Sequence, residues 1–244
     1  MTVDVLAIGA HPDDVELGCG GTVAKLAQSG RRVGILHLTR GEAGTRGSAE
    51  TRREEAEAAA AILGAVVVEF LDCGDGAFRN GTGEEDTLIE ALRRLRPELV
   101  FAPTPADRHP DHGRAHRLVL DAAYYAGLKN RAPGRGGEPH RPAALFSYPQ
   151  HDPIEPAFIV DVTATWGAKM RALDAYESQL SRQDQTGESS GTATKVASRE
   201  FRLAVEGRAR HYGQLVGAEF GEGFLSRSPL AVADPWQLLP GGLR

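Results

Sequence analysis

Short apolar runs, each closed by glycine or polar residues and separated by helical patterns, recur along most of this chain. This order is typical of βαβ units, in which parallel strands form a sheet covered by helices on both faces. We therefore expect an α/β, Rossmann-like, mostly parallel sheet. The expected strands are Val3–Ile8, Val33–Leu38, Val66–Leu71, Glu98–Ala102, Ala144–Tyr148 and Phe158–Val162. The expected helices lie near Gly21–Ser29, Ala49–Leu63, Glu84–Leu95, His112–Ala126, Thr165–Leu180 and Val196–Tyr212.

The size of the chain favours one large domain over residues 1–244, because 244 residues with 41% hydrophobic composition can bury a sizeable core. Two segments interrupt the strand and helix pattern. Residues 131–141 are rich in proline and glycine, and residues 181–193 are rich in serine, glycine, threonine and glutamine. Both are expected to be surface loops. For the second segment, a lid over a binding site is the alternative to a solvated loop.

The charge balance excludes some classes of partner. A formal net charge of −5, with no long basic run, argues against standing contact with nucleic acid. No stretch approaches the roughly 20 apolar residues of a membrane span, and the first residues lack the pattern of a secretory signal. Two cysteines, Cys19 and Cys73, are too few for a disulfide framework and are expected to be free thiols. We expect a cytoplasmic protein with no membrane partner.

Titratable side chains gather directly after two of the expected strands. The loop Gly9–Glu16 holds four of them within six positions, and residues 103–112 hold a second group that ends in His109-Pro110-Asp111-His112. Because the carboxyl ends of parallel strands meet at one edge of a sheet, the two groups can converge. Imidazole and carboxylate ligands suit zinc and also iron(II). The sequence therefore predicts a metal site.

The spacing within these groups leaves the choice of ligands open. His112 and His116 stand four residues apart on an expected helix, but the chain lacks the adjacent glutamate of the HExxH pattern. His116 is therefore interpreted as a helix-face histidine rather than a ligand. In the adjacent pair Asp13-Asp14, one carboxylate can bind the ion while the other faces a water molecule, because neighbouring side chains on an extended loop point apart.

The segment Gly9–Thr22, which contains Ala10-His11-Pro12-Asp13-Asp14, resembles the AHPDD signature of the LmbE-like, or PIG-L-like, N-deacetylases. His109-Pro110-Asp111-His112 resembles the second motif of that family. Further segments that resemble it are Thr51–Ala56, Ala172–Gln179 and Glu222–Phe224. These outer segments are most similar to the bacillithiol-biosynthesis branch, which deacetylates N-acetylglucosaminyl malate.

The resemblance implies a zinc ion held by His11, Asp14 and His112, with iron(II) as the alternative metal. It also implies a small-molecule N-acetyl amino-sugar substrate. A homo-oligomer, built as a hexamer of two trimers, is the assembly that the family implies.

Four further positions take roles from the same resemblance. Asp13 would be the general base, and His109 would stabilise the oxyanion or donate a proton to the leaving amine. Asp111 would orient His109 or a neighbouring ligand. Arg52 would hold the substrate through its planar guanidinium.

The expected activity is removal of the acetyl group from N-acetylglucosaminyl malate, with diacetylchitobiose as the alternative substrate. One departure concerns Phe201, where a tyrosine is expected in the most similar relatives and where phenylalanine cannot donate a hydrogen bond. Tyr148, Tyr176 and Tyr212 are the other candidates for such a hydroxyl.

Two other classes of function are compatible with an α/β sheet of this kind. A nucleotide-binding protein needs GxGxxG directly after the first strand, whereas here the glycines of Gly18–Thr22 come later and acidic residues occupy that place. We therefore interpret these glycines as packing a helix closely on the sheet. A non-catalytic metal-binding or sugar-binding protein would keep the ligands without the base, and Asp13 is present.

Overall fold

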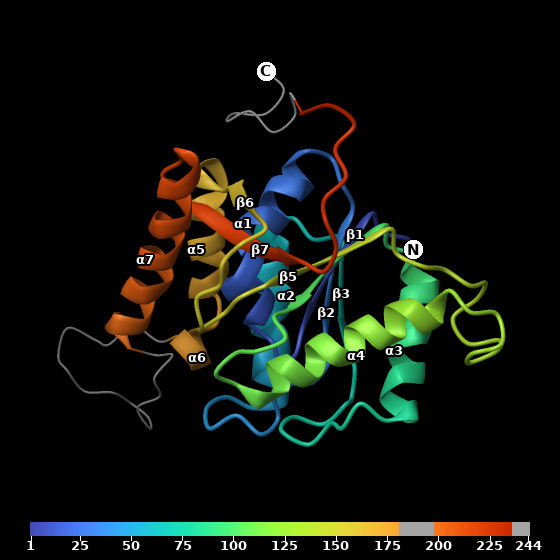
Figure 1. Ribbon diagram of the computed structural model, residues 1–244. Helices are drawn as coiled ribbons and strands as arrows, with labels where there is room; N and C mark the ends of the chain where they lie inside the picture. The colour runs from blue at the N-terminus through green and yellow to red at the C-terminus, as the bar shows by residue number, and fades with distance from the viewer. Residues whose placement is uncertain (181–197, 236–244) are drawn as a thin grey trace.

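In the part of the chain that the structure describes, seven strands form one sheet in the order β3-β2-β1-β4-β5-β7-β6 (Figure 1). The computed structural model describes residues 1–180 and 198–235. The strands are β1 (Val5–Gly9), β2 (Val33–His37), β3 (Val67–Phe70), β4 (Leu99–Pro103), β5 (Ala144–Tyr148), β6 (Phe158–Asp161) and β7 (Gly221–Ser226). Strands β1 to β5 pair with one another in parallel, as expected from the sequence.

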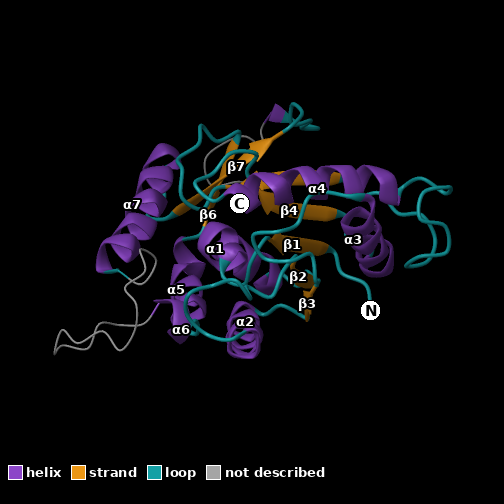
Figure 2. Cartoon of the chain, turned by 90° about the horizontal axis from the view of Figure 1, so that it is seen from below, coloured by secondary structure: helices purple, strands orange, loops and turns teal. Residues whose placement is uncertain are grey.

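Helices cover both faces of the sheet (Figure 2). They are α1 (Asp14–Gln28), α2 (Ala49–Leu63), α3 (Thr82–Leu95), α4 (Pro110–Ala126), the 3-10 helix η1 (Thr163–Thr165), α5 (Trp166–Asp174), α6 (Glu177–Leu180) and α7 (Arg199–Val216). Apolar residues of α1, α2 and α5 form one core cluster with β1 and β2, and those of α3 and α4 form a second on the opposite face. The predicted Rossmann-like α/β class is confirmed.

The strand order reverses between β1 and β4. From β1 the chain adds β2 and β3 on one side, and then returns to place β4 on the other side. The loops that leave the carboxyl ends of β1 and β4 therefore diverge to opposite faces of the sheet and leave a crevice between them. Both polar motifs lie at this crevice.

Strand β7 is missing from the sequence prediction. It pairs antiparallel with β5 on one side and with β6 on the other. Its sequence, Gly-Glu-Gly-Phe-Leu-Ser, carries two glycines and a charged residue, so it lacks the apolar alternation that marks a strand. The sheet is therefore mixed at this edge.

The predicted start of the first helix, at Gly21, is wrong. Helix α1 begins at Asp14 and is broken at Cys19, whose φ of −142° and ψ of 21° are not helical. Three glycines within four positions have low helix propensity and hid the first segment from a pattern-based assignment. The predicted helix Thr165–Leu180 is likewise divided into η1, α5 and α6.

The two expected loops have different outcomes. Residues 131–141 form turns without a helix or strand, as predicted, whereas the loop 181–193 lies outside the described residues. Both cysteines are free thiols. Within the described ranges, none of the helices combines the length and apolar character needed to cross a membrane.

Candidate metal centre

The loop after β1 enters α1 through an unusual backbone conformation. Asp13, the residue before the helix, has a φ of 102° and a ψ of −21°, a region that residues with a side chain rarely adopt. The His11 amide donates to Asp14 Oδ2 at 2.9 Å, and the Leu17 amide donates to Asp13 O at 2.9 Å. The sharp turn therefore brings two adjacent carboxylates, both buried, to the crevice.

The loop after β4 enters α4 through an ordinary helix cap. His109 has an extended backbone, with a φ of −87° and a ψ of 125°, and its Nδ1 accepts a hydrogen bond from the Asp111 amide at 3.2 Å. Pro110 occupies the first helical turn, where a missing N–H is tolerated. Asp111 and His112 follow on the first turn and are buried.

The three predicted ligands lie close to one another at the crevice. Asp14 Oδ1 lies 3.4 Å from His112 Nε2, and Asp14 Oδ2 lies 3.6 Å from His11 Nδ1. Ligands bound to zinc at about 2.0–2.2 Å in a tetrahedron are separated by about 3.4 Å. The donor types and these two separations suit a zinc-type ion, and the choice of His11, Asp14 and His112 as its ligands stays a prediction. The groups of described residues whose ligand atoms all lie within 4.8 Å of one another are His11 with His109 and His112, and His11 with Asp75 and Asp111.

A carboxylate lies behind each of the two imidazole rings. His112 Nδ1 lies 3.4 Å from Asp107 Oδ1. His11 Nε2 lies 3.2 Å from Asp75 Oδ1 and 3.4 Å from Asp111 Oδ2. Each ring thus turns one nitrogen to Asp14 and the other to a carboxylate, which is the arrangement that fixes the tautomer and angle of a metal-binding histidine.

The two adjacent aspartates differ in their affinity for a proton. Burial raises the pKa of Asp13 to about 7, the Asp14 carboxylate adds to the rise, and Arg52 opposes it. Burial also acts on Asp14, but attraction to His112 and the hydrogen bond from His11 hold the pKa of Asp14 well below its usual value. Asp14 therefore stays ionised, as a ligand must, while Asp13 can accept a proton near neutral pH.

His109 completes a group of three imidazoles with His11 and His112, whose ligand atoms lie within 4.8 Å of one another. Burial, followed by the neighbouring His11 and His112, lowers the pKa of His109. Because Nδ1 accepts from the Asp111 amide, the neutral ring carries its proton on Nε2. His109 can thus donate a hydrogen bond, which suits its predicted role better than that of a fourth ligand.

Arg52 of α2 is buried and bound to the β1 loop. Its guanidinium donates to Pro12 O at 2.6 Å and to Gly41 O at 3.0 Å, and it lies 3.7 Å from Asp13 Oδ2. These contacts support the strained turn at Asp13. The substrate-binding role expected of Arg52 stays a prediction.

Several residues of the site carry no role in the sequence analysis. Asp75, which follows β3, and Gln150, which follows β5, contact His11 and Asp14, and the His151 ring stacks on His112 at 5.9 Å. Asp107 stands inside the second polar segment without an assigned role. The sequence could have indicated these residues through their positions directly after β3, β4 and β5. The carboxyl ends of those strands share the edge of the sheet that holds the site.

Comparison with known proteins identifies the family. Residues 6–123 match the family described as PIG-L: GlcNAc-PI de-N-acetylase. The diacetylchitobiose deacetylase of Thermococcus kodakarensis is 35% identical over 189 residues, which cover 72% of this chain and 70% of that enzyme. This chain belongs to the PIG-L family. The family expected from the two motifs is confirmed.

Relatives of this PIG-L chain catalyse two classes of reaction. A 4-oxalmesaconate hydratase of Pseudomonas putida is 30% identical over 197 residues, covering 71% of this chain and 73% of the hydratase. The crystal structure of a conserved protein from Thermus thermophilus aligns with a TM-score of 0.85 and 38% identity, covering 96% of this chain and 99% of that one. The reaction must therefore be argued from the site as well as from the PIG-L fold.

The candidate hydroxyl groups are already engaged or enclosed in this PIG-L chain. Tyr148 donates to Ile8 O at 2.7 Å, and Tyr212 donates to Ile154 O at 3.2 Å. Tyr176 is fully buried against the core. The Phe201 ring lies 5.6 Å from that of His151, at the edge of the site, and offers no hydroxyl there.

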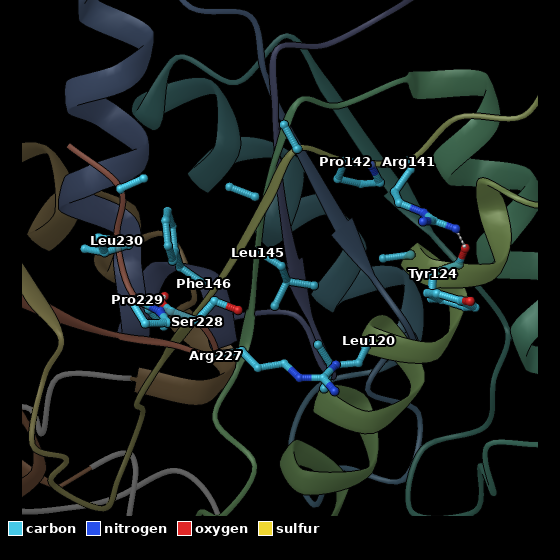
Figure 3. A pocket seen from close by; sticks show the side chains of 15 residues that line it. Leu120, Tyr124, Arg141, Pro142, Leu145, Phe146, Arg227, Ser228, Pro229 and Leu230 are labelled. Atoms are coloured by element: carbon cyan, nitrogen blue, oxygen red, sulfur yellow. Dashed lines mark hydrogen bonds between the residues drawn. The ribbon is translucent and has the colours of Figure 1, made fainter. Parts of the chain in front are cut away.

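Two cavities differ in their relation to the metal centre. The larger, about 660 Å³, lies between α4, β5 and residues 226–231, and its described lining contains no histidine or carboxylate (Figure 3). The other, about 370 Å³, adjoins the centre through Gln150 and His151, and its lining also includes Arg108 and Phe201. A substrate that reacts at the candidate metal centre would therefore bind in the smaller cavity.

Proposed function

We propose that this chain is a metal-dependent N-deacetylase that hydrolyses the acetamido group of an N-acetylglucosaminyl conjugate. The observation that carries the proposal is the division of labour between two adjacent carboxylates. Asp14 faces the His11 and His112 rings and stays ionised, whereas Asp13 has a pKa raised to about 7. A ligand beside a base is the arrangement that hydrolysis of an amide needs.

In this proposal His11, Asp14 and His112 hold the ion, with the ring-to-carboxylate distances of 3.6 and 3.4 Å as support. When bound, zinc or iron(II) would supply a Lewis acid that polarises the acetyl carbonyl and makes water easier to deprotonate.

The remaining chemistry belongs to the side chains of this chain. Asp13 takes a proton from the water that attacks the acetyl carbon. The Nε2–H of neutral His109 donates a hydrogen bond to the developing oxyanion, since its Nδ1 is already bound to the Asp111 amide. The proton that Asp13 took from water then passes to the nitrogen of the leaving amine as the C–N bond breaks. Acetate and a free amine are the products.

The finer proposal is that the conjugate is N-acetylglucosaminyl malate. Support comes from the outer segments that resemble the bacillithiol branch and from the cavity of about 370 Å³, where the Arg108 guanidinium suits a carboxylate. Diacetylchitobiose is the second candidate, because the Thermococcus relative that carries that activity in its name is 35% identical.

The testing experiment measures acetate release from N-acetylglucosaminyl malate and from diacetylchitobiose. Each assay is run with the purified protein, after treatment with a chelator, and after zinc is restored. Release that is lost with chelator and regained with zinc supports the deacetylase. The substrate with the higher kcat/KM decides the finer proposal.

A parallel assay follows hydration of 4-oxalmesaconate, the substrate named for the Pseudomonas relative. Hydration without acetate release would contradict the deacetylase proposal and assign the same residues to addition of water. Acetate release that persists at full rate in the chelated protein would contradict the metal requirement.

A further inference from the structure

A buried ion pair lies next to the metal centre without touching it. Lys169 of α5 donates from Nζ to Glu222 Oε1 of β7 at 2.6 Å, and the two residues are 2% and 3% exposed. No role in the proposed chemistry falls to either residue. Charged side chains are rarely buried so completely, so the contacts that this pair makes need an explanation.

The pair sits in the break of α1. Lys169 Nζ donates to Leu17 O at 2.9 Å, a carbonyl at the end of the first segment of the helix. The Glu222 carboxylate accepts from the amides of Gly21, at 3.0 Å, and Thr22, at 2.7 Å, at the start of the second segment. Helix ends leave carbonyls and amides without partners, and here one ion pair satisfies both ends that meet at Cys19.

The first segment of α1 carries the metal centre at its other end. It runs only from Asp14 to the break at Cys19, and Leu17, which binds Lys169 through its carbonyl, binds Asp13 O through its amide. The direction of this short segment therefore decides where the Asp13 and Asp14 carboxylates point. A helix continuous through Cys19 would rotate them relative to His112 on the other side of the crevice.

We propose that Lys169 and Glu222 are positioning residues that hold α1 in two segments and thereby aim Asp13 and Asp14 into the metal centre. The inference rests on the proposed function for the identity of that centre. If the pair only stabilised the fold, replacing it would change the free energy of unfolding and leave zinc affinity unchanged. Neutral replacement of a whole buried ion pair often leaves stability nearly unchanged, so an effect on zinc affinity can be measured separately.

The test uses the double variant Lys169→Met with Glu222→Gln, which leaves no unpaired buried charge. We expect its zinc affinity, measured by competition with a chelator, to fall about tenfold or more at temperatures where circular dichroism shows a folded protein. Thr165→Val is a milder variant that removes a hydroxyl donating to Gly21 O at 2.8 Å, and a smaller loss of zinc affinity is expected. If the double variant does not fold, Thr165→Val is used in its place.

Arg93→Met is the matched control. Arg93 is 2% exposed and donates to Ala126 O at 3.0 Å and Ala132 O at 2.7 Å, at the end of α4 that points away from the centre. This variant should lose stability and keep the wild-type zinc affinity. Unchanged zinc affinity in the folded double variant would overturn the inference.

Hydrogen exchange separates this inference from the proposed function. In the wild-type chain without added metal, the amides of Gly21 and Thr22 should be protected, and in the double variant α1 should exchange faster than α2 does. A wild-type protein that binds no zinc would defeat the proposed function alone, and exchange in α1 would then decide the inference. Exchange in α1 that the double variant leaves unaltered would refute it.

Discussion

The two sides of the metal centre are held in place by different means. On the β4 side, His109 caps α4 through its own side chain, Pro110 fits the first turn, and the following residues take ordinary helical positions. On the β1 side, Asp13 adopts a φ of 102° without a side-chain cap, and contacts from α2, α5 and β7 hold the segment.

The two sides differ in whether local or tertiary contacts set the backbone that carries the site residues. The β4 side forms from residues near one another in sequence, because a helix cap and a proline set its backbone. The β1 side needs a strained turn that only distant partners can maintain. The proposed base, Asp13, lies on the strained side, and the proposed hydrogen-bond donor to the oxyanion, His109, lies on the locally organised one.

The largest expected effect concerns the base itself. Asp13→Asn keeps a residue type that tolerates positive φ but removes the carboxylate that accepts the proton. We expect turnover to fall by about 10²–10⁴-fold with zinc content unchanged. Acetate release and metal stoichiometry measured on one preparation check this, and substantial activity at full metal occupancy would refute the assignment.

The carboxylates behind the two rings allow a direct comparison of the sides. Asp107 is the one carboxylate among the described residues that lies behind His112 Nδ1, so Asp107→Asn should weaken zinc binding by about 10–100-fold. Asp75→Asn should have a smaller effect, because His11 Nε2 keeps Asp111 at 3.4 Å. Zinc dissociation constants of both variants give the ranking, and the reverse order would mean that Asp75 is the main support of His11.

Glycine substitutions compare a helix at the site with one elsewhere. A Cβ at Gly18 would overlap the Tyr148 ring, so Gly18→Ala should lower the free energy of unfolding by about 1–3 kcal/mol. At Gly207 of α7 a Cβ meets open space, so Gly207→Ala should raise it by about 0.5–1 kcal/mol. Urea unfolding measures both. If Gly18→Ala raised the free energy of unfolding as much as Gly207→Ala does, close packing of α1 on β5 would be unimportant.

The strain at Asp13 can be measured apart from catalysis. Asp13→Gly and Asp13→Ala both lack the carboxylate, but only glycine adopts a φ of 102° freely. The glycine variant should therefore be more stable than the alanine variant by about 1–2 kcal/mol in urea unfolding. Equal stability would argue that the turn is relaxed when the carboxylate is absent.

Much of the fold followed from local sequence patterns. Strands β1, β2 and β5 are short apolar runs, and α2 lies between a serine cap and a glycine, so both could be located from sequence. Strand β7 and the first segment of α1 could not, because glycines in both weaken the pattern and tertiary contacts decide the conformation. Gly221 of β7, for example, packs against the backbone of α7.

The candidate site, like the fold, could be predicted only in part from the sequence. Residues consecutive in sequence, such as His11, Asp13 and Asp14, show their chemistry as a motif. Asp75 and Gln150 stand outside any such motif, and only the topology brings them to His11 and Asp14. The same holds for Lys169 and Glu222, whose partner segments are far apart along the chain.

The placement of β7 also orders the events of folding. Among the described strands, β6 pairs only with β7, although α5 and α7 come between them in the chain. A growing chain can therefore assemble β1 to β5 while β6 still lacks a neighbour, and the contacts that close the break in α1 arrive with the later strand. Maturation of the catalytic crevice is accordingly expected to be among the last steps of folding, after most of the sheet has formed.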